Sequence, residues 1–245
     1  MPHFYVNPQN ITNNTFTIKD EQFHYLSNVR RFSVDDEINI FDGLGNCYRG
    51  KITSVDKKSL SGVILSTKTS LKADTEIVLY TAIPKGERFD WLIEKASEIG
   101  VSKIVPIIYL RSVVTDFSAN KLERYKKISV SASSQSWRAD IMEISSPMKF
   151  SDAVNNVCNE NNLNVLPYES EENNKIFSVL QEETKNNKIK NINIFIGPEG
   201  GFDSTEIDLA LNKNFKIVTL GKNILRIETA AIVAASCCQL FDKIK

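Results

Sequence analysis

Two short glycine-containing loops constrain the fold of this chain more than any other feature of its sequence. The first, at residues 197–202 (GPEGGF), follows an apolar run at residues 192–196 that has the length of a buried strand. A second strand is predicted at residues 215–220, and it ends at Gly221. Open α/β sheets bind their ligands at the carboxyl ends of strands. The sequence therefore predicts a ligand site formed by these two loops.

The residues of the first loop and of the helix that follows it limit the kind of ligand. Asp203 or Ser204 is predicted to be the N-cap of that helix, and Glu206 is placed to complete a capping box. Neither loop contains GxGxxG or GxxxxGK[ST], the motifs that bind phosphates. Pro198 also lacks a backbone N–H that could bind an anion. A neutral or cationic ligand fits better than a phosphate, although a glycine after a strand is also ordinary turn chemistry.

The composition is that of a globular chain and excludes several classes of protein. Hydrophobic residues make up 42% and charged residues 24%, and no run of eighteen apolar residues occurs. We therefore expect a cytoplasmic protein without a signal peptide or a membrane-spanning helix. We expect no metal site, because the cysteines form no CxxC pair and only His3 and His24 supply imidazole. Cys237 and Cys238 are interpreted as core residues of the last helix.

The charge distribution alone gives no support for nucleic-acid binding. Lysine and arginine number 30 and aspartate and glutamate also number 30, so the net charge is zero. Residues 1–72 carry nine basic and seven acidic side chains, a net charge of +2, and the remaining residues carry 21 and 23, a net charge of −2. Contact with RNA must therefore depend on a few well-placed arginines rather than on a strongly basic surface.

The first 70 residues are predicted to form a small β-barrel. Short strands alternate with turn signals, and one of these is a hairpin loop at residues 42–46. A short helix is predicted to begin after Asp20 as its N-cap. Residues 66–75 are polar and are interpreted as a linker. The expected elements are strands at residues 4–6, 16–18, 37–41, 48–55 and 60–66, and a helix at residues 21–29.

The rest of the chain alternates between strand and helix patterns, which predicts a parallel sheet covered by helices on both faces. The clearest helix lies at residues 87–99, with its apolar residues on one face and Gly100 at its C-terminal end. The further elements expected are strands at residues 76–83, 103–109 and 163–168, and helices at residues 120–136, 175–183 and 228–244.

Several segments of the chain resemble one known family. IGPEGGF followed by LGKNILRIETAAI is similar to the two signature segments of the RsmE-type ribosomal RNA uridine N3-methyltransferases, which belong to the SPOUT superfamily. PKGERFDWLIEKASEIGVSKIVP and SASSQSWRADIMEI are similar to further segments of that family. HYLSNVRRF and DEINIFDGLGNCYRGKI resemble its PUA-like N-terminal domain. The chain departs from the family pattern at Ile227, Ser134 and Met142.

The resemblance implies an α/β fold with two domains. Residues 71–245 would form a SPOUT methyltransferase domain with a parallel sheet and a trefoil knot, one of the rare exceptions to unthreaded topology. Residues 1–70 would form a PUA-like β-barrel that binds RNA. The implied cofactor is S-adenosyl-L-methionine, and the implied partners are 16S ribosomal RNA within the small subunit and a second copy of the chain, with no metal and no membrane.

The implied reaction requires groups that bind the cofactor and groups that activate uracil N3, which carries a proton. Glycine lets a ligand lie against the backbone, so the two loops suit the cofactor. Arg226 is a candidate for stabilising negative charge on the base, and Glu228 or Glu199 for accepting the proton. The candidate cofactor-binding residues are Leu166, Pro167, Ile196, Gly197, Gly201, Leu220, Gly221, Ile224 and Leu225. The candidate RNA-binding residues are Arg30, Arg31 and Arg138.

Structural interpretations of the charged residues stay open from the sequence. Glu228 could favour the dipole of the last helix, and Arg226 could form an ion pair with it. Arg30 and Arg31 could form a solvated helix end. Two other functions also stay open: methylation of a ribose 2′-oxygen in transfer RNA, and a non-catalytic RNA-binding or ribosome-assembly role.

Overall fold

The computed structural model describes residues 3–26, 30–71, 73–186 and 188–242, and the chain divides into two compact units. The first unit comprises Met1–Lys72 and Val130–Ile141, and the second comprises Ala73–Ser129 and Met142–Lys245, as far as these residues are described. The boundary expected from the sequence, after residue 70, places residues 130–141 in the second domain. In the structure this segment is grouped with the N-terminal residues instead.

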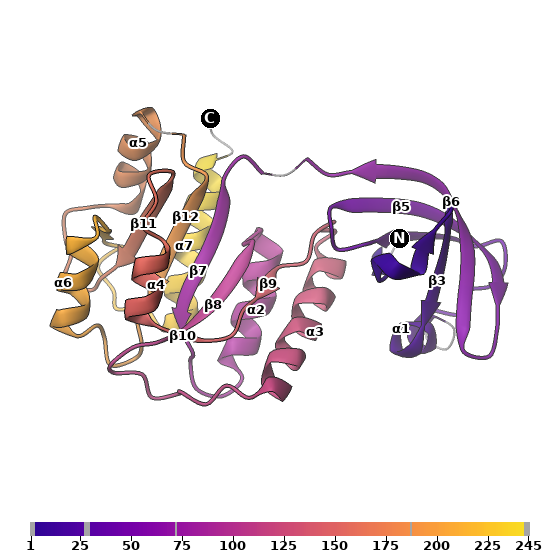
Figure 1. Cartoon of the computed structure of the whole chain (residues 1–245), viewed down its shortest axis with the longest axis horizontal. Helices are drawn as coiled ribbons and strands as arrows, with labels where there is room; N and C mark the ends of the chain where they lie inside the picture. The colour runs from indigo at the N-terminus through magenta and orange to yellow at the C-terminus, as the bar shows by residue number, and fades with distance from the viewer. Residues whose placement is uncertain (1–2, 27–29, 72, 187, 243–245) are drawn as a thin grey trace. The chain divides into compact units, whose positions relative to one another are not determined.

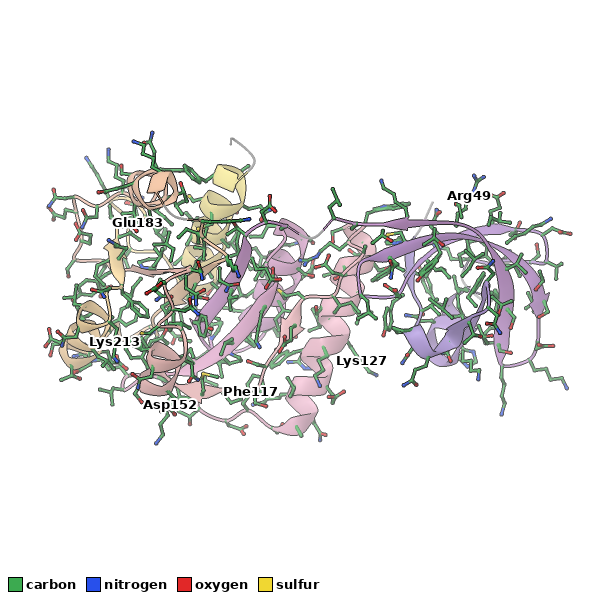
Figure 2. The ribbon with its side chains drawn as sticks, turned by 45° about the horizontal axis from the view of Figure 1, so that its top comes forward. Arg49, Phe117, Lys127, Asp152, Glu183 and Lys213 are labelled. Carbon is green, nitrogen blue, oxygen red and sulfur yellow. The ribbon has the colours of Figure 1, made fainter. Side chains whose placement is uncertain are left out.

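The first unit is a curled β-sheet with the strand order β1-β4-β5-β6-β3-β2 (Figure 1). β1 pairs with β4 in parallel, and the other neighbours are antiparallel. Its buried core includes Phe16, Leu26 and Ile52, while charged side chains such as Arg49 lie at the surface (Figure 2). The elements are β1 (His3–Tyr5), η1 (Pro8–Asn10), β2 (Ile11–Thr12), β3 (Thr15–Lys19), α1 (Asp20–His24), β4 (Glu37–Phe41), β5 (Asn46–Val55) and β6 (Ser59–Thr69).

Two local predictions for this unit are wrong. The expected linker at residues 66–75 begins inside β6, because the antiparallel register pairs Asn46 with Thr69 and Cys47 with Lys68. Backbone pairing does not require apolar side chains, so the polar composition of residues 66–69 did not indicate that they continue the strand. The helix begins at Asp20 rather than after it, since β3 pairs through Lys19 and leaves no residue between strand and helix. The end of that predicted helix, at residues 27–29, lies outside the described residues.

The second unit is built on a parallel sheet, as the alternating pattern predicted. Its strand order is β10-β8-β7-β12-β11-β13, and β9 pairs with β8. Helices cover both faces of this sheet (Figure 1). The elements are β7 (Glu76–Ala82), α2 (Arg88–Ile99), β8 (Lys103–Ile108), α3 (Ala119–Gln135), β9 (Glu143–Ile144), β10 (Met148–Lys149), α4 (Phe150–Asn156), β11 (Asn162–Pro167), α5 (Ile176–Asn186), β12 (Asn191–Ile196), α6 (Ser204–Asn212), β13 (Lys216–Val218) and α7 (Ile227–Asp242).

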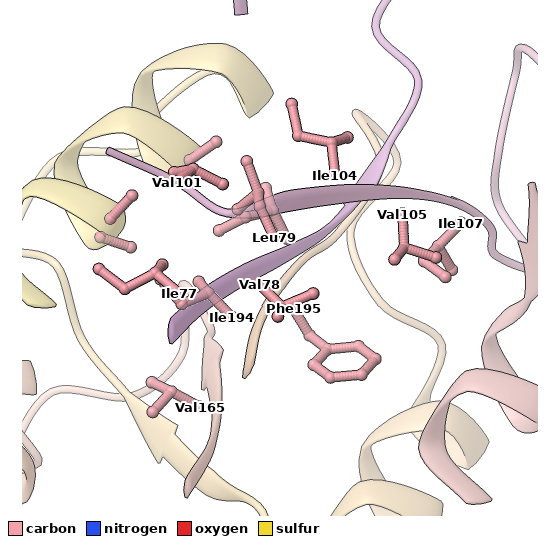
Figure 3. Close-up of a cluster of buried hydrophobic side chains, with 14 of the residues drawn as sticks. Ile77, Val78, Leu79, Val101, Ile104, Val105, Ile107, Val165, Ile194 and Phe195 are labelled. Carbon is pink, nitrogen blue, oxygen red and sulfur yellow. The ribbon is translucent and has the colours of Figure 1, made fainter. Parts of the chain in front are cut away.

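The core of this unit lies between the sheet and its helices. Side chains from neighbouring strands meet there, among them Leu79 of β7, Ile104 of β8 and Ile194 of β12 (Figure 3). The predicted helix at residues 87–99 is confirmed as α2, which ends at Gly100 with a φ of 98° and a backbone N–H that donates to Ala96 O. Burial of these apolar residues is the main source of stability for such a layered unit.

Helix α7 packs against the sheet through small and apolar residues. Cys238 is buried and Cys237 is partly buried on this helix, as the sequence predicted, and both are free thiols. Burial raises the pKa of each thiol. Helix α7 contacts α2, α5, β7 and β12, which fixes its N-terminal turn beside the carboxyl edge of the sheet. Among the helices that the structure describes, none is long and apolar enough to cross a membrane.

Candidate active site

A cavity of about 410 Å³ lies at the carboxyl edge of the parallel sheet, within the second unit. Its walls come from the ends of β11 and β12, from the two glycine-containing loops, and from the first turns of α2 and α7. Eight of the nine residues expected to bind a cofactor line it. They are Pro167, Ile196, Gly197, Gly201, Leu220, Gly221, Ile224 and Leu225.

Leu166, the ninth, has no exposed surface and belongs to the hydrophobic core. Successive side chains of a strand point to opposite faces of the sheet, so Pro167 reaches the cavity and Leu166 does not line it.

The first loop is shaped by close packing against its own backbone. The ring of Phe202 lies so near to Gly197 that a Cβ there would be 2.8 Å from Phe202 Cε2. The Gly201 N–H donates to Pro198 O at 2.9 Å and closes the turn. Phe202 is buried and meets Tyr109 edge to face, with ring centroids 5.4 Å apart. Glycine at residue 197 therefore keeps the wall of the cavity thin and made of backbone.

A capping box fixes the end of the first loop, as the sequence predicted. Asp203 is the N-cap of α6 and accepts the Thr205 N–H, while Glu206 Oε2 accepts the Asp203 N–H at 2.9 Å. Hydrogen bonds from Thr205 and Arg111 lower the pKa of Asp203. Glu206 is buried, and its Oε1 accepts the Leu110 N–H at 2.8 Å. One carboxylate thus joins the loop to the segment that follows β8.

The second loop is held at its start and exposed at its tip. The Thr219 N–H donates to Asn174 O at 2.8 Å, and the Gly221 N–H donates to Thr219 Oγ1 at 3.2 Å. Gly221 has a φ of 125°, a conformation that L side chains rarely adopt. Ile224 is 87% exposed although it borders the cavity, so it presents an apolar surface to whatever enters.

The charged residues of the cavity differ in burial and in their partners. Glu228 is only 9% exposed, and its Oε1 lies 3.9 Å from Arg88 Nε. Its Oε2 is buried and has no hydrogen-bond partner among the described residues. Arg226 is exposed at the rim, and within the described part of the chain its guanidinium makes no ion pair. The ion pair considered for Arg226 and Glu228 is therefore replaced by one between Arg88 and Glu228.

The position of Glu228 also fits the alternative role considered for it, a favourable interaction with the dipole of the last helix. It lies in the first turn of α7, where a negative charge favours the helix dipole. Glu199, the other carboxylate considered for proton transfer, lines the cavity from the first loop but is exposed to solvent. The two candidates therefore occupy different environments within one cavity.

The three arginines considered for RNA binding lie in the first unit. Arg30 and Arg31 are exposed, and Arg30 Nε donates to Tyr25 Oη at 3.2 Å. Arg31 has a φ of 56°. The side chain of Arg138 is only 11% exposed and forms an ion pair with Asp140. Arg30 and Arg31 thus present their charge to solvent, whereas the charge of Arg138 is largely neutralised inside the unit.

Arg88 is a residue of the cavity that the sequence did not single out. It is the first residue of α2 and follows β7 by a short loop. The pairing of β7 with β12 brings this loop beside the first glycine-containing loop, more than one hundred residues later in the chain. The sequence holds no local signal for that pairing, so only the sheet order reveals the position of Arg88.

Comparisons with known proteins agree with the presence of two units in this chain. A family model described as an RNA methyltransferase domain matches residues 71–239, and one described as an RNA methyltransferase PUA domain matches residues 18–65. The chain is 30% identical over 244 residues to the ribosomal RNA small subunit methyltransferase E of Buchnera aphidicola, across 98% of this chain and 93% of that relative.

The chain belongs to the ribosomal RNA small subunit methyltransferase E family. Two solved structures with bound S-adenosyl methionine share its fold. A ribosomal RNA small subunit methyltransferase E from Neisseria gonorrhoeae, bound to S-adenosyl methionine, is 29% identical with a TM-score of 0.86, across 98% of this chain and 97% of that one. A methyltransferase from Legionella pneumophila, in complex with the same cofactor, is 26% identical with a TM-score of 0.82, across 97% and 96%.

Proposed function

We propose that this chain transfers a methyl group from S-adenosyl-L-methionine to N3 of a uridine in 16S ribosomal RNA of the small ribosomal subunit. Its family supports the class of reaction, because its relatives are named as methyltransferases of that subunit's RNA. The observation that carries the proposal is the cavity in which the two glycine-containing loops meet the first turn of α7. Both loops lie at the carboxyl edge of the sheet, where α/β folds bind ligands.

The residues of the cavity fit S-adenosyl-L-methionine. Its volume of about 410 Å³ lies within the range of roughly 300–1,000 Å³ that is usual for small-molecule sites. Ile196, Leu220 and Leu225 supply apolar contact, and the absence of a side chain at Gly197 and Gly221 lets adenine and ribose lie against the backbone. When bound, this cofactor supplies a methyl group on a positively charged sulfur. The one buried charge that lines the cavity among the described residues, Glu228 paired with Arg88, does not oppose such a ligand.

The charged residues of the cavity provide what uracil needs in order to react. Its N3 carries a proton and becomes a nucleophile when that proton leaves. Arg226, exposed at the rim, can donate hydrogen bonds to the oxygens beside N3 and stabilise the charge that develops there. Glu228 and Glu199 line the same cavity as candidates for accepting the proton. Alignment of the two reactants in one cavity is then the main contribution of the protein.

The proposal extends to the RNA and to the assembly of the protein. We assign RNA binding to the N-terminal domain, residues 1–70, through Arg30 and Arg31, and the methyltransferase domain to residues 71–245. Arg138 is a weaker candidate because its guanidinium is paired with Asp140. The proposal also includes a homodimer, a cytoplasmic location and a C-terminal segment threaded as a trefoil knot. Exposed apolar residues of the second unit, such as Leu110, Val113 and Ile224, support a surface that a second copy covers.

Two measurements test this function. Isothermal titration calorimetry of the folded protein with S-adenosyl-L-methionine should give one site per chain, and absence of binding would contradict a catalytic role. Mass spectrometry of 16S RNA from a strain that lacks the gene should show the loss of one 3-methyluridine. Loss of a ribose 2′-O-methyl group instead would assign the other methyltransferase reaction. An unchanged set of modifications would favour a non-catalytic RNA-binding protein.

A further inference from the structure

Glu228 is a buried carboxylate whose hydrogen-bonding capacity is unused. It lines the cavity with 9% of its surface exposed, and its Oε2 has no hydrogen-bond partner in the part of the chain that the structure describes. Its interaction with Arg88 spans 3.9 Å, which is an ion pair but too long for a hydrogen bond. Buried carboxylates are expensive unless donors satisfy them. The free Glu228 Oε2 is therefore available to a hydrogen-bond donor of a bound ligand.

The positive charge of Arg88 offsets part of the free-energy cost of burying the Glu228 carboxylate. Arg88 is the first residue of α2, Glu228 lies in the first turn of α7, and these two helices pack against each other. The pair is therefore held by two rigid elements rather than by a loop. The Arg88 side chain is 46% exposed, so its charge compensates Glu228 while much of the guanidinium stays solvated.

Building on the function proposed above, we propose that Glu228 accepts the N3 proton of the substrate uracil and that Arg88 is its positioning residue. The N3–H bond breaks and its proton moves to the Glu228 carboxylate. The electron pair left on N3 forms the new bond to the methyl carbon, and the electron pair of the carbon–sulfur bond stays on sulfur, which becomes a neutral thioether. Glu228 then returns the proton to solvent.

The environment of Glu228 selects it over Glu199. Glu199 is exposed on the first loop, so solvent competes for its oxygens and holding its side chain in place costs conformational entropy. Glu228 keeps unoccupied lone pairs in a fixed direction. A proton acceptor must lie within hydrogen-bond reach of the proton that it takes, and a fixed carboxylate meets this requirement without loss of side-chain entropy.

Kinetics on small subunits reconstituted with transcribed 16S RNA test this role. Glu228→Gln should lower kcat by about 100-fold, since general bases contribute roughly 10²–10⁴-fold. Arg88→Gln should lower kcat by about tenfold, and Arg88→Lys should restore most of that loss. Because neither residue is proposed to hold the cofactor, its affinity measured by calorimetry should change by less than about threefold in all variants. Lys103→Gln is the matched control, because it removes a surface ion pair with Glu143 at the opposite edge of the sheet.

Transcripts made with 5-fluorouridine separate proton transfer from structural support. Fluorine makes N3–H more acidic, so a variant that lacks the base should recover a large part of its activity on the fluorinated RNA. Equal deficits on both RNAs, or an unchanged kcat in Arg88→Gln, would overturn the role of the pair while leaving the methyltransferase function intact. A wild-type protein that methylates no uridine N3 would instead contradict the proposed function. Thermal unfolding of each variant identifies any loss of activity that comes from misfolding. Among folded variants, recovery of Glu228→Gln on the fluorinated RNA, together with near-normal kcat in Arg88→Lys, supports the role of the pair.

Discussion

The buried carboxylates among the described residues, Asp42, Glu206 and Glu228, show how burial alone does not identify a functional residue. Asp42 accepts hydrogen bonds from the backbone and side chains of its own hairpin loop. Glu206 accepts two backbone N–H groups. Of these three residues, only Glu228 has a buried oxygen without a hydrogen-bond partner. Unused hydrogen-bonding capacity therefore distinguishes the carboxylate of the cavity from the two that support the fold.

Asp42 predicts a dependence of stability on pH. Burial by itself would raise the pKa of Asp42, but hydrogen bonds from Asn46, Leu44 and Tyr48 outweigh it and lower the pKa. The stabilisation is therefore complete above the unfolded value of about 3.9 and is lost as the pH falls through the lower folded value. Asp42→Asn should reduce the free energy of unfolding by about 1–3 kcal/mol at pH 7, measured with urea. That difference should shrink in acid, and a difference independent of pH would contradict this account.

The cysteines predict a pattern of chemical reactivity. Cys158 is exposed, whereas burial raises the pKa of the Cys238 thiol and keeps it protonated at neutral pH. Iodoacetamide at pH 8 should therefore modify Cys158 in the folded protein and Cys238 only after unfolding. Peptide mass spectrometry after a timed reaction measures both. Equal labelling of the two thiols would show that α7 is not packed as described.

At the scale of elements, the first loop depends on the link between α6 and the segment after β8. Glu206→Ala would leave the N–H groups of Leu110 and Asp203 without their acceptor. We expect a loss of about 2–4 kcal/mol in the free energy of unfolding, together with weaker binding of S-adenosyl-L-methionine.

Urea unfolding and calorimetry measure these two effects of Glu206→Ala. Glu183→Ala is the control, because it removes a surface ion pair with Lys216 and should cost less than about 1 kcal/mol. Unchanged cofactor affinity in Glu206→Ala would show that the loop keeps its shape without this link.

The second loop depends on the backbone conformation of Gly221. Its φ of 125° is strained for alanine, although no neighbouring atom lies within 4 Å of the position of a Cβ. Gly221→Ala should weaken S-adenosyl-L-methionine binding by about tenfold or more, because relief of roughly 1–3 kcal/mol of strain moves the loop. Gly45→Ala is the control variant, since Gly45 has a φ of 105° and no atom within 4 Å of a Cβ position, but lies in the first unit, which does not contain the cavity. It should leave cofactor binding unchanged. If both variants bound the cofactor as the wild type does, Gly221 would have no part in the site.

Elements with strong local signals could be predicted from the sequence, and elements set by distant pairing could not. The amphipathic pattern of α2, the capping box of α6 and the glycine-containing loops are local, and the structure contains each of them. β9, β10 and α4 are too short to show a period, so no local pattern of residues predicts them. The polar end of β6 and the position of Arg88 are fixed by strand pairing, which depends on residues far away in the chain.

In the whole molecule, the two units supply different parts of the proposed reaction. The second unit holds the cavity and the charged residues that would act on a base. In the first unit, residues 18–65 match a family model described as an RNA methyltransferase PUA domain, and Arg30 and Arg31 are exposed there. With a net charge of zero, the chain offers no general attraction for RNA, so we propose that recognition depends on these local features.

We propose that the cavity at the carboxyl edge of the sheet is the place where methyl transfer to uracil N3 occurs. The most direct test incubates the purified protein with S-adenosyl-L-methionine and small subunits from a strain that lacks the gene, followed by nucleoside mass spectrometry of the 16S RNA. We expect one 3-methyluridine to form per 16S RNA, and far less to form with Glu228→Gln. Absence of any new methylated nucleoside, or a methyl group at another atom, would contradict this proposal.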